Sequence, residues 1–271
     1  MTSTTATADR LRNLHRWNIG VGLAHLVQGI AILALSTSFS IAVVATVMTG
    51  PPGAADSLSL QRTFFDFPFT IAIAVFLFLA AGDHLLMSIG PVRRWYEANL
   101  ARGINVARWV EYSISASIMI VLICLLNGIN NLYALIAVFG VNASMILFGL
   151  LMEKVNLGRD GDEVTWWPFW FGCIAGIVPW IAIVIGLITS ATDTTTVNGV
   201  RVNPDGVPGF VYGIVISLFL LFNCFALNQW LQYRKRGRFA DYLFGEKVYL
   251  VLSLVAKSAL AWQIFAGTLA S

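Results

Sequence analysis

Residues 112–152 read YSISASIMIVLICLLNGINNLYALIAVFGVNASMILFGLLM and contain no charged side chain. A helix needs about 20 mostly apolar residues to cross a bilayer core about 30 Å thick, because each residue adds about 1.5 Å to its length. The stretch is long enough for two such helices, and Asn127-Gly-Ile-Asn-Asn131 in its middle has the residues of a turn. It therefore predicts two membrane-spanning helices joined by a short connection.

The remaining chain carries further apolar stretches of this kind. Hydrophobic residues make up 58% of the 271 residues and charged residues 11%, whereas soluble domains usually contain about a quarter charged residues. Seven stretches have spanning length: 17–36, 64–89, 106–126, 132–152, 166–188, 207–233 and 241–269. We predict an all-α membrane protein, a single seven-helix domain over residues 1–271, placed multi-pass in the cell membrane. The net charge of +3 is small and scattered, and it gives no reason to expect nucleic acid as a partner.

The connection between the first two spans, residues 39–61, has a pattern of its own. It is rich in β-branched residues before a turn sequence, Gly50-Pro-Pro-Gly53. Ile41, Val43 and Val44 favour strands over a disordered loop. We predict a β-hairpin that lies outside the membrane.

The positions of the basic residues predict the orientation of the chain. Of the 17 Lys and Arg residues, all except Arg62, Arg201 and Lys257 fall on the side of the membrane that holds the N-terminus. Loops rich in Lys and Arg stay in the cytoplasm. The N-terminus is therefore expected in the cytoplasm, the C-terminus outside, and the hairpin in the first extracellular loop.

One lysine lies inside the last apolar stretch. Lys257 occurs in VLSLVAKSALAW, residues 251–262, and a lysine at the bilayer centre costs about 2.5–3.5 kcal/mol on insertion scales. A structural lysine held in an ion pair, or a misplaced span boundary, would also account for it. The functional interpretation is a desolvated amine that forms a Schiff base with an aldehyde.

A glutamate in the third span lies at a matching height. Glu111 is nine residues beyond Arg102, and Lys257 is ten residues beyond Lys247, so both lie at a similar depth from the cytoplasmic side. A buried cation needs an anion beside it, which makes Glu111 the candidate counterion. The alternative is a surface pair between Glu111 and Arg108 on the same helix.

Two histidines and two serines fall in the same layer. By the same count His25 and His84 reach the depth of the lysine, Ser253 precedes Lys257 by one helical turn, and Ser115 follows the glutamate by one turn. These residues predict a polar cluster on the cytoplasmic side of the amine. The alternative for each histidine is a hydrogen-bonded core residue without a functional role.

The extracellular half of the predicted bundle is poor in ionisable residues. None follows Lys257 in the chain, none lies in spans five and six, and Asp66 is the exception at the mouth of span two. Ion transport needs relay groups on both sides of the central site, so this distribution disfavours a pump or channel. No nucleophile–base pair and no metal-spaced ligand set indicates an enzyme or a metal site.

Five long motifs resemble the heliorhodopsin family, and the resemblance runs over essentially the whole chain. They are Arg108-Trp-Val-Glu-Tyr-Ser113, residues 139–148 (FGVNASMILF), residues 168–180 (PFWFGCIAGIVPW), Pro208-Gly-Phe-Val-Tyr-Gly213 and residues 252–263 (LSLVAKSALAWQ). The hairpin turn and the inverted orientation also match this family of microbial rhodopsins.

The resemblance implies a photoreceptor with all-trans retinal as its chromophore. The cofactor would be bound to Lys257 as a Schiff base, with Glu111 as counterion and a polar cluster that includes His25, His84 and Ser253. The family's pocket positions fall on Ser115, Asn142, Met145, Trp170 and Phe222. The resemblance further implies isomerisation toward 13-cis, proton transfer from the Schiff base to the polar cluster, a slow photocycle, a homodimer and an unidentified soluble partner in the cytoplasm.

The sequence therefore predicts a light sensor that signals and does not pump ions. The alternative is a light-driven or light-gated ion transporter, with the proton as the first candidate ion. A third class is a seven-helix receptor or transporter without retinal. A visible absorption band that hydroxylamine bleaches would exclude this third class.

Overall fold

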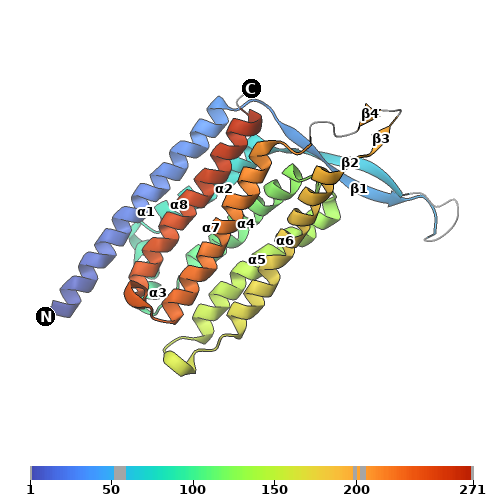
Figure 1. The fold of residues 1–271 in the computed structure, drawn as a ribbon. Coiled ribbons are helices and arrows are strands. Elements are labelled where there is room, and N and C mark those ends of the chain that lie inside the picture. Colours follow the sequence, from blue (N-terminus) through green and yellow to red (C-terminus); the bar gives the residue numbers. More distant parts are fainter. Residues whose placement is uncertain (1, 52–58, 198–199, 202–205, 270–271) are drawn as a thin grey trace.

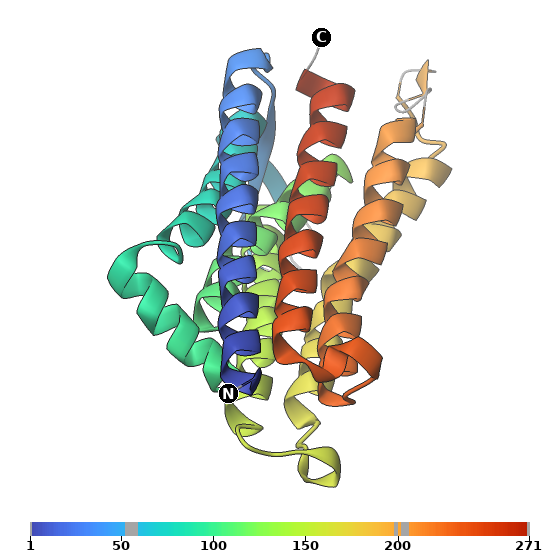
Figure 2. The ribbon, with the colours of Figure 1, turned by 90° about the vertical axis from the view of Figure 1, so that its left-hand side faces the viewer.

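The computed structural model describes residues 2–51, 59–197, 200–201 and 206–269. In this part of the chain seven helices are long and apolar enough to cross a membrane, as predicted. They are α1 (Thr2–Leu35), α2 (Phe69–Leu86), α4 (Val106–Leu126), α5 (Leu132–Val155), α6 (Trp167–Thr192), α7 (Gly209–Tyr233) and α8 (Tyr242–Ile264), the last continued by a π-helical turn, η3 (Phe265–Leu269). Figures 1 and 2 show one bundle whose chain ends lie at opposite ends, called here the N-terminal end and the C-terminal end.

The two largest differences from the predicted span boundaries are at the starts of helices. Helix α1 begins before residue 17, already at Thr2, and α2 begins at Phe69 instead of residue 64. The difference at α2 arises because residues 64–68 pair as a strand, whose apolar side chains resemble the start of a span in the sequence. The connection between α2 and α4 holds a further helix that was not predicted, α3 (Gly90–Ala101), at the N-terminal end (Figure 2).

The predicted hairpin is present at the C-terminal end and is longer than expected. Strand β1 (Ser40–Met48) pairs antiparallel with β2 (Ser59–Pro68), with a bulge at Val43/Val44. Pro52 and Gly53 of the predicted turn lie outside the described residues. The α4–α5 turn holds the hairpin, since Val44 N donates to Asn130 O at 3.0 Å and Asn131 Nδ2 donates to Thr46 Oγ1 at 3.0 Å.

The remaining elements are short. Two 3₁₀ turns, η1 (Gly161–Glu163) and η2 (Gly237–Ala240), lie in connections at the N-terminal end, and a second hairpin, β3 (Thr196–Val197) with β4 (Val200–Arg201), precedes α7. None of these short elements is one of the seven spanning helices.

Helix α4 occupies the centre of the bundle and places the site. It contacts α2, α5, α6 and α7, and 72% of its span is buried, against 22–50% for the other six. Toward the C-terminal end its side chains pack in an apolar core with Phe76, Leu218 and Leu260. Toward the N-terminal end it buries Arg108 and Glu111. The helix that contributes Arg108 and Glu111 is therefore the one most shielded from lipid.

Candidate functional site

Lys257 forms a buried ion pair with Glu111. The lysine is 3% exposed and the glutamate 8%. Lysine Nζ lies 3.1 Å from Glu111 Oε2 and donates a hydrogen bond to Ser253 Oγ at 3.0 Å. Ser253 precedes the lysine by four residues on α8, so one helical turn places the hydroxyl beside the amine. Two helices distant in sequence thus supply a cation, its anion and a hydroxyl.

Arg108 does not take the role of partner to Glu111. Its Nη2 lies 2.6 Å from Glu153 Oε1, and its Nη1 contacts Glu246. Asn105 donates a hydrogen bond to each of these carboxylates. Its backbone N–H donates to Glu153 Oε2 at 2.9 Å, and its Nδ2 donates to Glu246 Oε2 at 2.7 Å. The alternative of a surface pair between Arg108 and Glu111 is therefore wrong, because α4 turns the two side chains toward different neighbours.

The Arg108–Glu153–Glu246 group was missed by the sequence analysis. Glu153 directly follows the predicted span 132–152, and Glu246 lies next to Lys247 near the start of the last span. The available signal was three ionisable residues within apolar helices, each needing a partner. All three are buried, and the guanidinium carbon also lies 3.8 Å from the centroid of the Tyr249 ring.

We expect Arg108→Lys to lower the free energy of unfolding by about 2 kcal/mol, because a single ammonium cannot replace a planar guanidinium that binds two buried carboxylates. Thermal unfolding in detergent would measure this as a fall in Tm. The matched control is Arg93→Lys, whose partner Glu97 lies one turn away on α3 at 2.7 Å in a partly exposed pair. Such pairs contribute less than about 1 kcal/mol. Equal effects of the two substitutions would contradict the structural role of Arg108.

The two predicted histidines lie together. The rings of His25 and His84 stack with centroids 6.0 Å apart and planes inclined by 11°. His84 Nδ1 lies 3.0 Å from Asn18 Oδ1 and 3.8 Å from Asp83 Oδ2. Both histidines are buried, and neither ring nitrogen of His25 has a hydrogen-bond partner among the described residues. Asn18 and Asp83 join this polar group without having been predicted as its members.

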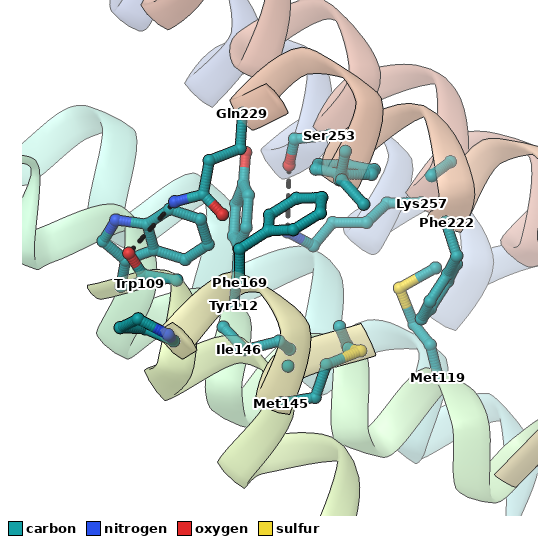
Figure 3. Close-up of a pocket in the computed structure, with 17 residues that line it drawn as sticks. Trp109, Tyr112, Met119, Met145, Ile146, Phe169, Phe222, Gln229, Ser253 and Lys257 are labelled. Carbon is teal, nitrogen blue, oxygen red and sulfur yellow. Dashed lines mark hydrogen bonds between the residues drawn. The ribbon is translucent and has the colours of Figure 1, made fainter. Parts of the chain in front are cut away.

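An apolar cavity of about 780 Å³, including its mouth, begins at Lys257. Figure 3 shows Lys257 and Phe222 on one side and Trp109 and Gln229 on the other. The lining is largely apolar: Trp109, Tyr112, Ala116, Met119, Met145, Ile146, Gly149, Pro168, Phe169, Gly172, Phe222, Phe225, Ala226, Gln229, Ser253, Ala256 and Lys257.

The predicted pocket positions divide into two sets. Met145 and Phe222 line the cavity together with Lys257 and Ser253. Ser115, Asn142 and Trp170 do not: Ser115 is buried elsewhere, and Asn142 Nδ2 donates to Ser117 Oγ at 3.0 Å.

Trp170 requires a correction, because it is 54% exposed on the outside of the bundle. Its neighbour Phe169 lines the cavity in its place. Successive residues of a helix point about 100° apart, so a shift of one position moves a side chain from the cavity to the lipid-facing surface.

The cavity suits an elongated apolar aldehyde. A primary amine at its wall can condense with the aldehyde, the apolar lining can cover the hydrocarbon, and the carboxylate can balance a positively charged nitrogen. Gly149 contributes space, because a Cβ there would overlap the Trp109 ring. In the described residues no group of three His, Cys, Asp or Glu side chains could hold a metal ion.

The fold and the site define a seven-helix membrane protein with a buried amine at an apolar cavity, and solved microbial rhodopsins share its fold. The light-driven proton pump LR (Mac) from Leptosphaeria maculans shares the fold, with a TM-score of 0.59, 17% identity, and 92% of each chain covered. Cyanorhodopsin from the cyanobacterium Tolypothrix sp. also has a TM-score of 0.59, with 14% identity over 96% of this chain and 94% of the other.

The sequence model of the heliorhodopsin family matches residues 14–269. The chain therefore belongs to the heliorhodopsin family. Membership implies a retinal chromophore in a multi-pass membrane protein. No curated protein matches the chain.

Proposed function

We propose that the protein is a light sensor that carries all-trans retinal on Lys257. The observation that supports this most directly is the buried Lys257–Glu111 pair, 3.1 Å apart at the wall of the apolar cavity. The amine would attack the aldehyde carbon, a C=N bond would form, and the aldehyde oxygen would leave as water. When bound, retinal supplies absorption of visible light and isomerisation about a double bond.

Glu111 acts as the counterion in this proposal. Its carboxylate stabilises the positive charge on the lysine nitrogen, and Ser253 Oγ orients that nitrogen at 3.0 Å. Glu111 Oε1 has no hydrogen-bond partner among the described residues, so it keeps the capacity to accept another donor.

His25 and His84 receive the proton that leaves the lysine nitrogen after illumination. This is supported by their burial and by the stacking of their rings, whose centroids are 6.0 Å apart. In the described residues, both ring nitrogens of His25 and the Nε2 of His84 have no hydrogen-bond partner, so they can accept a proton. Asn18 holds the other nitrogen of His84 at 3.0 Å and so orients that ring. The histidines provide a local store for the proton.

Signalling is favoured over ion transport by the distribution of charge. The buried Arg, Lys, Asp and Glu side chains of the described residues are Arg108, Glu111, Glu153, Glu246 and Lys257. They lie on α4, α5 and α8, while α6 and α7 contain no such residue. No buried carboxylate lies between Lys257 and the C-terminal end in the described residues, where a relay would have to continue.

The orientation and the partners belong to the same proposal. The excess of Lys and Arg at the N-terminal end supports a cytoplasmic N-terminus and an extracellular C-terminus. The α7–α8 connection, with Arg234, Lys235, Arg236 and Arg238, would then lie in the cytoplasm, where its charges can anchor the orientation or contact a soluble partner. A homodimer is expected from the family resemblance.

Illumination distinguishes a sensor from a transporter. We expect purified protein mixed with all-trans retinal to show a visible band that hydroxylamine bleaches. The same protein in lipid vesicles should give no sustained light-dependent change of external pH and no steady photocurrent, because the described residues of the C-terminal half include no buried carboxylate that could act as a relay. Vesicles without added retinal are the control. A sustained pH change that a protonophore abolishes would establish the transporter alternative, and the absence of any visible band would favour a receptor without retinal.

A further inference from the structure

The face of the Tyr112 ring lies against the amine of Lys257. Lysine Nζ is 4.7 Å from the ring centroid, and the tyrosine is 6% exposed. The face of an aromatic ring carries partial negative charge and attracts a cation within about 6 Å. Burial strengthens this attraction, since little water competes for the charge. In the part of the chain that the structure describes, the amine thus contacts a carboxylate, a hydroxyl and a ring face.

Two contacts hold the Tyr112 ring in this orientation. Its hydroxyl donates to the backbone oxygen of Tyr249 at 3.0 Å, across to α8. Phe225 on α7 meets it edge to face, with centroids 5.5 Å apart and planes inclined by 87°. The ring is thus fixed from two helices while its face is turned toward Lys257.

The ring also separates two environments. Tyr112 lines the apolar cavity and also a small polar pocket toward the N-terminal end, whose other walls include Asp83, Arg108 and Glu246. Without the ring, the charged groups of this pocket and the amine of Lys257 would share one space. Tyr112 is therefore placed to control which polar groups reach the nitrogen.

We propose that Tyr112 is a positioning residue that stabilises the positively charged nitrogen of Lys257 through its ring face and shields it from the polar pocket. This inference rests on the proposed function of Lys257. The polar and titratable groups that act on this nitrogen also include Glu111 on α4, Ser253 on α8, His25 on α1, and Asp83 and His84 on α2. All of these groups are kept in every variant of Tyr112, and the phenylalanine variants also keep the ring between the amine and the polar pocket.

The test replaces Tyr112 by leucine and by phenylalanine in the retinal-bound protein. Tyr112→Leu removes the ring face, and the pH midpoint of the visible band should fall by about one unit, a tenfold effect. Tyr112→Phe keeps the ring face and should stay within a few tenths of a unit of the unaltered protein. Hydroxylamine should bleach the leucine variant about tenfold faster, because the wall toward the polar pocket is lost. Phe219→Leu is the control, since it removes a ring from α7 that packs on Trp180 and does not line the cavity.

A second series keeps the packing constant. Phenylalanine with increasing fluorination at position 112 has nearly the same shape but a weaker negative face. The pH midpoint should fall stepwise with fluorination. In the retinal-free protein, the rate at which acetic anhydride modifies Lys257, followed by mass spectrometry across pH, should rise along the same series, because the uncharged amine becomes more populated.

The outcomes separate this inference from the proposed function. A visible band that forms in all variants with the same midpoint, or a fluorination series without a trend, would overturn the role of Tyr112 and leave Lys257 as the retinal site. Failure of the unaltered protein to form a visible band would overturn the proposed function itself. The modification rates of the retinal-free protein then still test the contact between ring and amine.

Discussion

Substitution of Lys257 by alanine is expected to abolish the visible absorption band completely. The chain has three other lysines, Lys154, Lys235 and Lys247, and all are exposed or half-buried at the N-terminal end, away from the cavity lining. None can deliver an amine to the space beside Glu111. Absorption spectra of the purified variant with added all-trans retinal would measure the loss, and Lys247→Ala, which removes a lysine from the same helix, should keep the band.

The alanine variant leaves the carboxylate of Glu111 buried without its cation, which destabilises a protein by about 3–5 kcal/mol. The double substitution Lys257→Ala and Glu111→Gln avoids this unpaired charge. It should elute as a folded protein in size-exclusion chromatography and still lack the band. A visible band that persists in the folded double variant would place the chromophore on another group and would contradict the proposed site.

Substitution of Glu111 by glutamine is expected to lower the pH midpoint of the visible band by up to about three units, a thousandfold effect. An anion beside a nitrogen favours its protonated form, and its removal favours the neutral form. The protonated chromophore, stable below the midpoint and lost as pH rises through it, would then disappear at a lower pH. A pH titration of the absorption spectrum measures the shift.

Glu246→Gln is the control for this shift. Its carboxylate is equally buried, but it contacts Arg108 instead of Lys257. We expect its midpoint to stay within about half a unit of the unaltered protein, because its charge is compensated locally. If the two variants titrate alike, Glu111 is not the counterion, and a longer-range field of the buried charges would have to hold the proton on the nitrogen.

The depth of several site residues can be predicted by counting positions along their helices. Glu111 and Lys257 were placed at one height because each lies nine or ten residues from a basic residue at the N-terminal end. Their side chains meet at 3.1 Å in the folded bundle. The same count placed His25 and His84 in one layer, where they stack. Height in the membrane follows from a constant rise per residue, so it can be predicted without a tertiary structure.

The direction in which a side chain points could not be predicted in this way. Arg108 was considered as the partner of Glu111, yet it pairs with Glu153 and Glu246 from two other helices. Trp170 was assigned to the pocket, which is lined by Phe169 instead. Each of these outcomes depends on the rotation of a helix about its axis, and only packing against its neighbours determines that rotation.

The boundary between strand and helix at residues 64–69 shows a related effect. Phe64, Phe65 and Phe67 look like the start of a span, but backbone pairing with β1 keeps them in a strand until Pro68. Apolar composition therefore predicted that seven segments lie in a membrane, and regular helix geometry predicted the depth of each charged group. Tertiary structure decided which groups touch, because contacts between distant segments depend on the angles at which the helices and the hairpin pack.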